Sequence, residues 1–352
     1  MKRCLPGQVP LEWKGNGVMK NEVVQSIKYY AILLAITALT VVFSQQTGRA
    51  QSAAPETKAT AIERGAATRY RTVKIDNLDV FYREAGDPSK PAIVLLHGFP
   101  TSSHMFRNLI PRLAKDYYVV APDYPGFGYS SAPKISEYDY TFENLSIVIE
   151  KFVGSLGIKK YSLYLQDYGA PIGYRLAVRS PEKVQALIVQ NGNAYDEGLR
   201  EFWNPFKSYW KEQTAENAKV LLGFLTHDIT KWQYTHGTRN PGGITPDNWT
   251  VDQYLLDRAG NKEIQLKLFM DYGTNPPLYP KWQAYFRQHQ PPTLIVWGKN
   301  DYIFPAEGAE PYKRDLKNIE FHLLNTGHFA LEEDSEIIGQ KMLDFLKNQK
   351  VR

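Results

Sequence analysis

The stretch Tyr161-Ser-Leu-Tyr-Leu-Gln-Asp-Tyr-Gly-Ala170 places a carboxylate where a strand is predicted to turn into a helix. The residues before Asp167 form a short apolar run, typical of a buried strand, and the run from Gly169 to Val178 opens with small residues and a proline, typical of a helix start. A tight strand-to-helix turn of this kind lifts one side chain above the sheet edge and directs it into a pocket. A carboxylate can displace a leaving group from a saturated carbon and form an ester with that carbon. A carboxylate at this position therefore favours cleavage of C–O or C–halogen bonds.

Two further residues complete a constellation in the chain order nucleophile, acid, histidine. Asp301 follows the predicted strand Thr293–Gly298, and His328 follows the next predicted strand, Ile319–Leu324. Such strand ends meet at one edge of a sheet, so the three side chains are expected to converge on one pocket. The alternatives are a turn role for Asp301, a surface role for His328 and a helix-capping role for Asp167, and three residues in this order at strand ends disfavour them. An aspartate paired with a histidine fixes its tautomer and supports the imidazolium that forms when it takes a proton from water. We therefore predict Asp167 as nucleophile, His328 as base and Asp301 as its partner.

A fourth element is the loop His97-Gly-Phe-Pro100, which follows the predicted strand Ala92–Leu96. The backbone N–H groups of Phe99 in this loop and of Tyr168, directly after the nucleophile, are predicted to form an oxyanion hole. Such a hole holds the tetrahedral intermediate that forms when water attacks an ester carbonyl. The side chain of His97 is expected to brace the loop by hydrogen bonding and not to act as a second base.

Strands and helices alternate on both sides of a helical, aromatic-rich segment. The alternation, with continuous Val/Ile/Leu strands, predicts an α/β fold in which a mostly parallel sheet is covered by helices on both faces. Residues 194–288 carry dense aromatics at helical spacing and no strong strand, so we predict an inserted helical cap over the edge where ligands bind. The predicted core therefore has two parts, residues 71–193 and 289–352, and a linker at residues 51–70 precedes it.

The first fifty residues are predicted to be a targeting segment. Lys20 and Lys28 precede an apolar stretch at residues 29–43, and polar residues then lead to the small-residue site Gly48-Arg-Ala50. Fifteen apolar residues are short for a membrane span, which needs about 20. We therefore predict that residues 1–50 are a signal peptide cleaved near that site, with export to the periplasm or the medium and no stable membrane span afterwards. A membrane anchor formed by the apolar stretch is the alternative.

Composition excludes several classes of function. Hydrophobic residues make up 43% of the chain, ample for a large core, and the net charge of +5 is concentrated at the N-terminus. Residues 1–50 hold six Lys/Arg and two Asp/Glu, leaving 36 basic and 35 acidic residues elsewhere, so nucleic acid is not expected as a partner. Cys4, the only cysteine, lies in the targeting segment, which excludes a disulfide, a thiolate metal site or a cysteine nucleophile in the mature chain. The turn Asp123-Tyr-Pro-Gly-Phe-Gly128 lacks the third glycine and helix of a dinucleotide site and is interpreted as scaffold. We predict neither a cofactor nor a metal ion.

Together these motifs resemble the α/β-hydrolase superfamily over roughly residues 70–350. The aspartate nucleophile narrows the resemblance to the branch of epoxide hydrolases and haloalkane dehalogenases. The stretch from His97 to Pro111 is similar to the dehalogenases, and so is Leu165, where epoxide hydrolases usually have glycine. Dehalogenases, however, bind the departing halide with a tryptophan after the nucleophile and a second Trp or Asn donor. The corresponding positions look like Tyr168 and Phe99, and phenylalanine has no donor.

The resemblance to epoxide hydrolases implies an acid for the oxirane oxygen, supplied by one or two cap tyrosines. The stretch Asn275-Pro-Pro-Leu-Tyr-Pro-Lys-Trp282 is similar to the second cap-tyrosine motif and implies Tyr279, while Tyr209, 42 residues after the nucleophile, is the candidate for the first. We therefore predict a cofactor-independent hydrolase that uses water to open apolar or aromatic epoxides to diols. Three alternatives stay open: a haloalkane dehalogenase with the same triad, an esterase-like hydrolase, and a non-catalytic ligand-binding protein on this fold.

Overall fold

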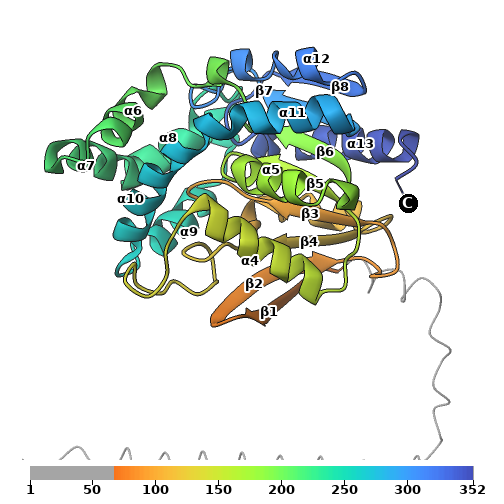
Figure 1. Ribbon diagram of the computed structural model, residues 1–352, viewed down its shortest axis with the longest axis horizontal. Coiled ribbons are helices and arrows are strands. Elements are labelled where there is room, and N and C mark those ends of the chain that lie inside the picture. Colours follow the sequence, from red (N-terminus) through yellow and green to blue (C-terminus); the bar gives the residue numbers. More distant parts are fainter. Residues whose placement is uncertain (1–66, 352) are drawn as a thin grey trace, which may run out of the picture. The chain divides into compact units, whose positions relative to one another are not determined.

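The computed structural model describes residues 67–351 of the chain, drawn in colour in Figure 1. The predicted signal peptide at residues 1–50, its alternative as a membrane anchor at residues 29–43, and most of the predicted linker lie outside the described residues. Between residues 67 and 351, no helix is both long enough and apolar enough to cross a membrane.

The described part contains an eight-stranded sheet. Its strands are β1 (Arg69–Ile75), β2 (Leu78–Ala85), β3 (Ala92–Leu96), β4 (Tyr118–Pro122), β5 (Tyr161–Gln166), β6 (Val184–Gln190), β7 (Thr293–Gly298) and β8 (Ile319–Leu324). Their order across the sheet is β1-β2-β4-β3-β5-β6-β7-β8. The β1–β2 and β2–β4 pairs are antiparallel and the other pairs are parallel, which confirms the predicted α/β fold with a mostly parallel sheet.

Side chains of the strands alternate between two hydrophobic cores, one on each face of the sheet. In β3, Val94 and Leu96 belong to one core, whereas Ile93 and Leu95 belong to the other. Because successive side chains of a strand point to opposite faces, both faces need a covering layer. The two layers are formed by α4 (Phe142–Ser155), α5 (Gly169–Arg179), α11 (Tyr279–His289) and α12 (Tyr312–Asp315) on one face and by α3 (Ile110–Leu113) and α13 (Leu331–Asn348) on the other.

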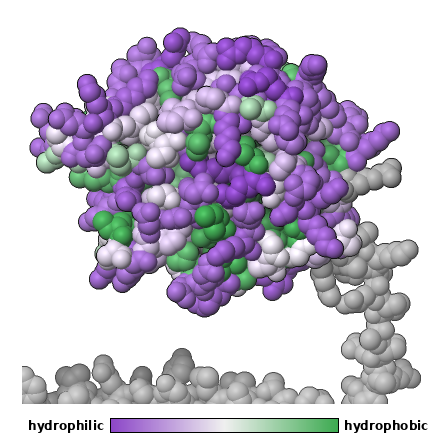
Figure 2. Space-filling model, in the orientation of Figure 1, coloured by the Kyte–Doolittle hydropathy of each residue, from purple (hydrophilic) through white to green (hydrophobic). Residues whose placement is uncertain are grey.

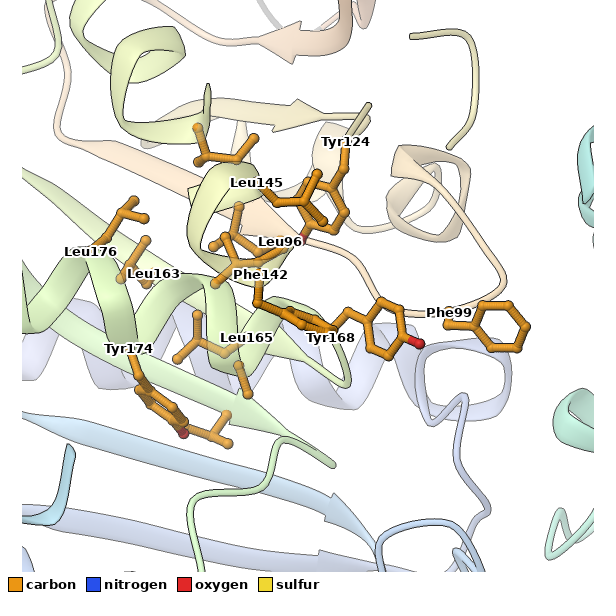
Figure 3. Packing of buried hydrophobic residues seen from close by; sticks show 14 of the residues in the cluster. Leu96, Phe99, Tyr124, Phe142, Leu145, Leu163, Leu165, Tyr168, Tyr174 and Leu176 are labelled. Atoms are coloured by element: carbon orange, nitrogen blue, oxygen red, sulfur yellow. The ribbon is translucent and has the colours of Figure 1, made fainter. Parts of the chain in front are cut away.

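Local sequence determines where the helices beside the site begin. The hydroxyl of Thr141 caps α4 by accepting a hydrogen bond, 3.1 Å long, from the amide three residues later. Helix α5 begins at Gly169, and Pro171 lies in its first turn, where the missing N–H leaves no helical hydrogen bond unmade. Side chains of β3, β5, α4 and α5 pack around this start, and Tyr168 directs its hydroxyl towards Phe99 (Figure 3). These contacts fix the turn between β5 and α5.

The segment predicted as a helical cap, residues 194–288, contains helices and no strand. Its longer helices are α6 (Asn204–Lys211), α7 (Ala215–Leu222), α8 (His227–Thr235), α9 (Asp247–Leu256) and α10 (Asn261–Asp271). Helix α11, in contrast, packs against α5, with the rings of Phe286 and Tyr174 5.3 Å apart, and lies beside α5 in Figure 1. The last residues of the predicted cap therefore belong to the layer that covers the sheet.

The aromatic side chains of the cap pack mainly on other aromatic side chains. Trp203 stacks on Tyr272 with ring centroids 4.5 Å apart, and the rings of Phe202 and Phe206 are stacked 5.7 Å apart. On the face seen in Figure 2, hydrophilic side chains predominate and the hydrophobic ones form small, separate patches. Most aromatic side chains of this segment are therefore buried or half-buried, whereas Tyr254 is exposed.

Candidate active site

The turn between β5 and α5 holds Asp167 in a conformation that few residues adopt. Its φ of 48° lies in the left-handed region, and the residue is 4% exposed. Gly169 follows so close to β3 that a Cβ there would lie 2.2 Å from the carbonyl oxygen of Leu96. Because only glycine fits, the chain can turn sharply and leave Asp167 at the carboxyl end of the sheet, as in a nucleophile elbow.

The two oxygens of the Asp167 carboxylate have different surroundings. Oδ1 accepts hydrogen bonds from the amides of Phe99 and Tyr168, each 2.7 Å long. Oδ2 receives no hydrogen bond from residues 67–351 and lies 3.9 Å from Nε2 of His328. The two amides predicted to form an oxyanion hole thus both contact the carboxylate itself. Oδ2 is left free to react, while Oδ1 stays where negative charge is stabilised.

His328 is held between the two predicted carboxylates. Its Nδ1 lies 2.8 Å from Oδ2 of Asp301, and Oδ1 of Asp301 accepts a hydrogen bond from the amide of Ile303 at 2.7 Å. Both side chains of the pair are buried. With the Nδ1 proton donated to Asp301, Nε2 carries the lone pair and lies 3.9 Å from Oδ2 of Asp167, which is the tautomer a general base needs. The structure therefore brings all three predicted triad residues together.

Burial and charge set the protonation of this group. Burial raises the pKa of Asp167 to about 6, against the opposing effects of His328 and of the two amides. Burial alone would lower the pKa of His328, but the charge of Asp301 and its hydrogen bond outweigh burial and leave that pKa raised. At neutral pH the nucleophile is therefore ionised, and the raised pKa makes His328 a stronger base.

Asn191, at the end of β6, connects the members of the triad and was not predicted from the sequence. Its Nδ2 donates to Oδ2 of Asp301 at 2.8 Å, and its main-chain oxygen accepts from the amide of Asp167 at 3.3 Å. Its Oδ1 accepts from the amide of Gly298 at 2.9 Å, which ties β6 to β7. The φ of Asn191 is 47°, a conformation that asparagine tolerates better than most residues. The Asn-Gly pair after an apolar strand is the one sequence signal that could have indicated this position.

Gln166, directly before the nucleophile, also escaped the sequence prediction. Its side chain is fully buried, and its Nε2 lies 3.0 Å from Nε2 of His328. Because an amide nitrogen only donates, this contact agrees with a His328 whose Nε2 is unprotonated. The Oε1 atom of Gln166 has no hydrogen-bond partner among residues 67–351. This glutamine therefore helps to hold the imidazole in place in this structure.

His97 braces the oxyanion loop, in the manner expected from the sequence. Its Nδ1 lies 2.9 Å from the carbonyl oxygen of Gly98, and its Nε2 accepts from the amide of Tyr124 at 3.3 Å. Burial lowers the pKa of His97 to about 3. With both ring nitrogens engaged by the main chain, the imidazole stays neutral and is not available as a base.

A small cavity lies against the nucleophile. Its volume, counted as the space open to the centre of a water molecule, is about 20 Å³. The residues that line it are Phe99, Asp167, Tyr168, Phe202, Trp203, Phe206, Phe224, Gln233, Phe269 and Ile303. Since one water needs about 10–15 Å³, the cavity has room for one or two waters, and a substrate has to displace cap side chains to enter. Its aromatic walls favour the apolar part of a ligand.

The two cap tyrosines predicted as acids do not line this cavity. Tyr279 is the first residue of α11, is 1% exposed, and its hydroxyl accepts a hydrogen bond from Nδ2 of Asn193 at 2.9 Å. Tyr209 lies in α6 and is 8% exposed. Neither tyrosine is among the residues that line the cavity beside Asp167. Helix α11 packs on the core, and other residues of the cap form the cavity wall. Within residues 67–351, no group of three or more His, Cys, Asp or Glu side chains could hold a metal ion.

Comparison with known proteins identifies the family. The family model described as alpha/beta hydrolase fold matches residues 91–335, which is more than half of the chain. The chain belongs to the α/β-hydrolase family. This hydrolase is 41% identical over 280 residues to an uncharacterized hydrolase of Saccharomyces cerevisiae, YNR064C, and the match covers 78% of this chain and 96% of that protein.

Other similar proteins lie in the branch that the motifs indicate. This hydrolase is 27% identical over 286 residues to epoxide hydrolase 3 of Mus musculus, covering 78% of this chain and 76% of that protein. The crystal structure of the haloalkane dehalogenase DbeA from Bradyrhizobium elkani USDA94 has a TM-score of 0.67 at 20% identity, over 81% of this chain and 99% of that one. The second likeness concerns the fold alone. The resemblance to the epoxide hydrolase and haloalkane dehalogenase branch is confirmed.

Proposed function

We propose that this hydrolase opens epoxides to diols through a covalent ester on Asp167. The observation that carries the proposal is the unequal environment of the two carboxylate oxygens, with Oδ1 held by two amides and Oδ2 free. A carboxylate that only directs water does not need an oxyanion hole around its own oxygen. A carboxylate that becomes an ester does, because the charge of the tetrahedral intermediate develops on that oxygen.

In the first step, Oδ2 of Asp167 forms a bond to an oxirane carbon, and the ring C–O bond breaks with its electron pair moving to oxygen. The ionised carboxylate needed for this attack predominates at neutral pH because its pKa is about 6. The released oxygen takes a proton from an acid. Family resemblance suggests Tyr279 and Tyr209 for this role, but neither residue lines the cavity beside the nucleophile.

In the second step, a water molecule loses a proton to Nε2 of His328 and attacks Cγ of the Asp167 ester. Negative charge develops on Oδ1, where the two amides already donate. Asp301 stabilises the imidazolium that forms. The intermediate then collapses, the alkyl oxygen takes the proton back from His328, and the diol leaves with one oxygen that came from the carboxylate.

Replacement of the base tests the two-step scheme. The His328→Gln variant is expected to form the ester but not to hydrolyse it, so incubation with an aryl epoxide such as styrene oxide should add one substrate mass to the intact protein. Peptide mapping should place that mass on Asp167. His322→Gln is the matched control, because His322 lies on β8 and pairs with Glu320, away from the cavity. Turnover of the epoxide by the wild-type protein without any adduct on the variant would rule the scheme out.

The dehalogenase alternative has the same nucleophile but a different leaving group. It requires donors for a halide ion, and the indole N–H of Trp203, which lines the cavity, is already donated to the carbonyl oxygen of Ile303 at 2.8 Å. A halide would therefore depend on the side chains of Tyr168 and Gln233, without the indole donor that dehalogenases use. Side-by-side assays of diol formation from epoxides and of free halide from 1-haloalkanes separate the two activities. Binding of both substrate classes without turnover would instead favour a ligand-binding protein.

A further inference from the structure

The cavity beside the nucleophile contains few polar groups. Apart from Asp167, the lining side chains with a hydrogen-bonding group are those of Tyr168, Trp203 and Gln233. The indole N–H of Trp203 is committed to the main chain of Ile303. The donors that remain for a ligand are therefore the hydroxyl of Tyr168 and the amide of Gln233.

Gln233 enters the cavity from helix α8 of the cap. It is 4% exposed, and its side chain forms no hydrogen bond with any residue between 67 and 351. A buried amide without a partner is destabilising, so such groups are uncommon in proteins unless a ligand or water satisfies them. The free amide therefore points to a ligand atom that accepts hydrogen bonds.

The hydroxyl of Tyr168 likewise has no hydrogen-bond partner among residues 67–351. Tyr168 is 3% exposed, and Figure 3 shows its hydroxyl directed towards Phe99, another residue of the cavity wall. Several other buried tyrosine hydroxyls are paired, as Tyr195 is with Asp315 at 2.8 Å. Burial, and next the charge of Asp167, raise the pKa of Tyr168 well above its ordinary value of 10, so the phenol carries its proton at neutral pH.

We propose that Tyr168 and Gln233 together receive the oxygen that is released from carbon when the epoxide opens. Tyr168 donates the proton, and Gln233 holds the same oxygen through its N–H group. The proposal rests on the proposed epoxide-opening function and deepens it. The division of roles follows from chemistry, because a phenol can transfer its proton whereas a carboxamide can only donate a hydrogen bond.

The protons and electrons balance over the two steps. When the ring C–O bond breaks, the electron pair on oxygen takes the Tyr168 proton, which leaves a phenolate beside the new ester. In the second step, one proton of the attacking water passes through His328 to the departing alkyl oxygen. The other proton is released as the regenerated Asp167 carboxyl group ionises, and it restores the phenol. The sum is one epoxide and one water converted to one diol.

The test measures the first step alone, in the His328→Gln background, as the rate at which the ester mass appears. Adding Tyr168→Phe is expected to slow ester formation by about 100-fold or more, the usual contribution of a general acid. Adding Gln233→Leu is expected to slow it by about tenfold or more through loss of a donor to developing charge. Matched controls are Tyr285→Phe, a buried tyrosine of α11, and Gln340→Leu, on exposed α13 surface, which should leave the rate within twofold.

The outcomes distinguish this proposal from the function on which it rests. Thermal unfolding of Tyr168→Phe should match that of the parent, because the hydroxyl it removes has no protein partner. Ester formation at the parental rate in Tyr168→Phe, or a loss seen in Tyr279→Phe or Tyr209→Phe instead, overturns the assignment and leaves the two-step function standing. Absence of any ester in the His328→Gln parent removes both.

Discussion

At the scale of single residues, the two carboxylate oxygens of Asp167 have different roles because they have different neighbours. Oδ2 is the proposed nucleophile, and Oδ1 accepts the two amide hydrogen bonds. The amides that hold Oδ1 come from two separate strand ends, so the oxyanion site is complete before substrate arrives. The same burial that forms this site opposes ionisation of the carboxylate. With a pKa of about 6, the carboxylate is charged at neutral pH but mostly protonated in mild acid.

The pH dependence of the reaction should report the raised pKa of Asp167. Burial raises the pKa of Asp167 to about 6, and attack needs the ionised form, so kcat/KM for an epoxide is expected to rise with pH through about 6. Well below that pH it should fall about tenfold for each pH unit. The measurement is a pH profile of kcat/KM on the wild-type protein. An acidic inflection near 4, where ordinary aspartates titrate, would contradict the assignment of the group.

Asn191 offers a second test at this scale. Asn191→Gly keeps the left-handed backbone conformation but removes the donor to Asp301. Ester hydrolysis, which depends on the His328–Asp301 pair, should slow by about tenfold or more, as expected when a charged group loses a hydrogen bond. Ester formation should stay within about threefold, because the main-chain contact to Asp167 remains. Pre-steady-state measurement separates the two steps, and equal losses in both would indicate general structural damage.

At the scale of the elements, the strand ends position the triad, and the cap helices determine which substrates can reach it. Asp167, Asp301 and His328 all follow strands of the parallel sheet, whereas most of the aromatic wall comes from the cap segment. The resulting cavity is too small for a substrate in this closed arrangement. Selectivity should therefore depend on the cap aromatics that are least firmly buried.

Phe224 is such a residue, since it lines the cavity and is only half-buried. Phe224→Ala is expected to raise kcat/KM for a bulky aryl epoxide by about tenfold relative to a small alkyl epoxide, the usual effect of a few carbon atoms of pocket space. Its stability should fall by about 2 kcal/mol, less than for a fully buried ring. Phe321→Ala, a half-buried ring on β8, is the control for stability loss without a change in selectivity. An unchanged ratio of kcat/KM for the two epoxides would show that Phe224 does not restrict substrate entry.

At the scale of the whole molecule, the parts that the sequence predicted best are those with strong local signals. The predicted strands Ala92–Leu96, Thr293–Gly298 and Ile319–Leu324 match the structure because fully buried parallel strands are continuous apolar runs. Gln233 was not predicted, because the direction in which a cap glutamine points depends on how its helix packs against a distant sheet. The role of Tyr279 stays a prediction from its motif, and the motif does not encode how α11 packs on α5.

Residues 1–50 add a prediction about the whole chain. We propose that the protein is exported and that these residues are removed, because a charged segment, a short apolar stretch and a small-residue site follow one another there. Intact mass of the protein recovered from the periplasmic fraction or the medium should show a chain that begins near residue 51. Full-length protein in the membrane fraction would favour the alternative anchor at residues 29–43.

The most direct test of the covalent mechanism follows the oxygen of water through a single turnover. Wild-type protein in excess over an epoxide, in water enriched in ¹⁸O, should incorporate one heavy oxygen into the peptide that contains Asp167 and release a diol that carries none. This result is expected because water attacks the carboxyl carbon of the ester and not the substrate. Heavy oxygen found in the diol, with none in that peptide, would contradict the account.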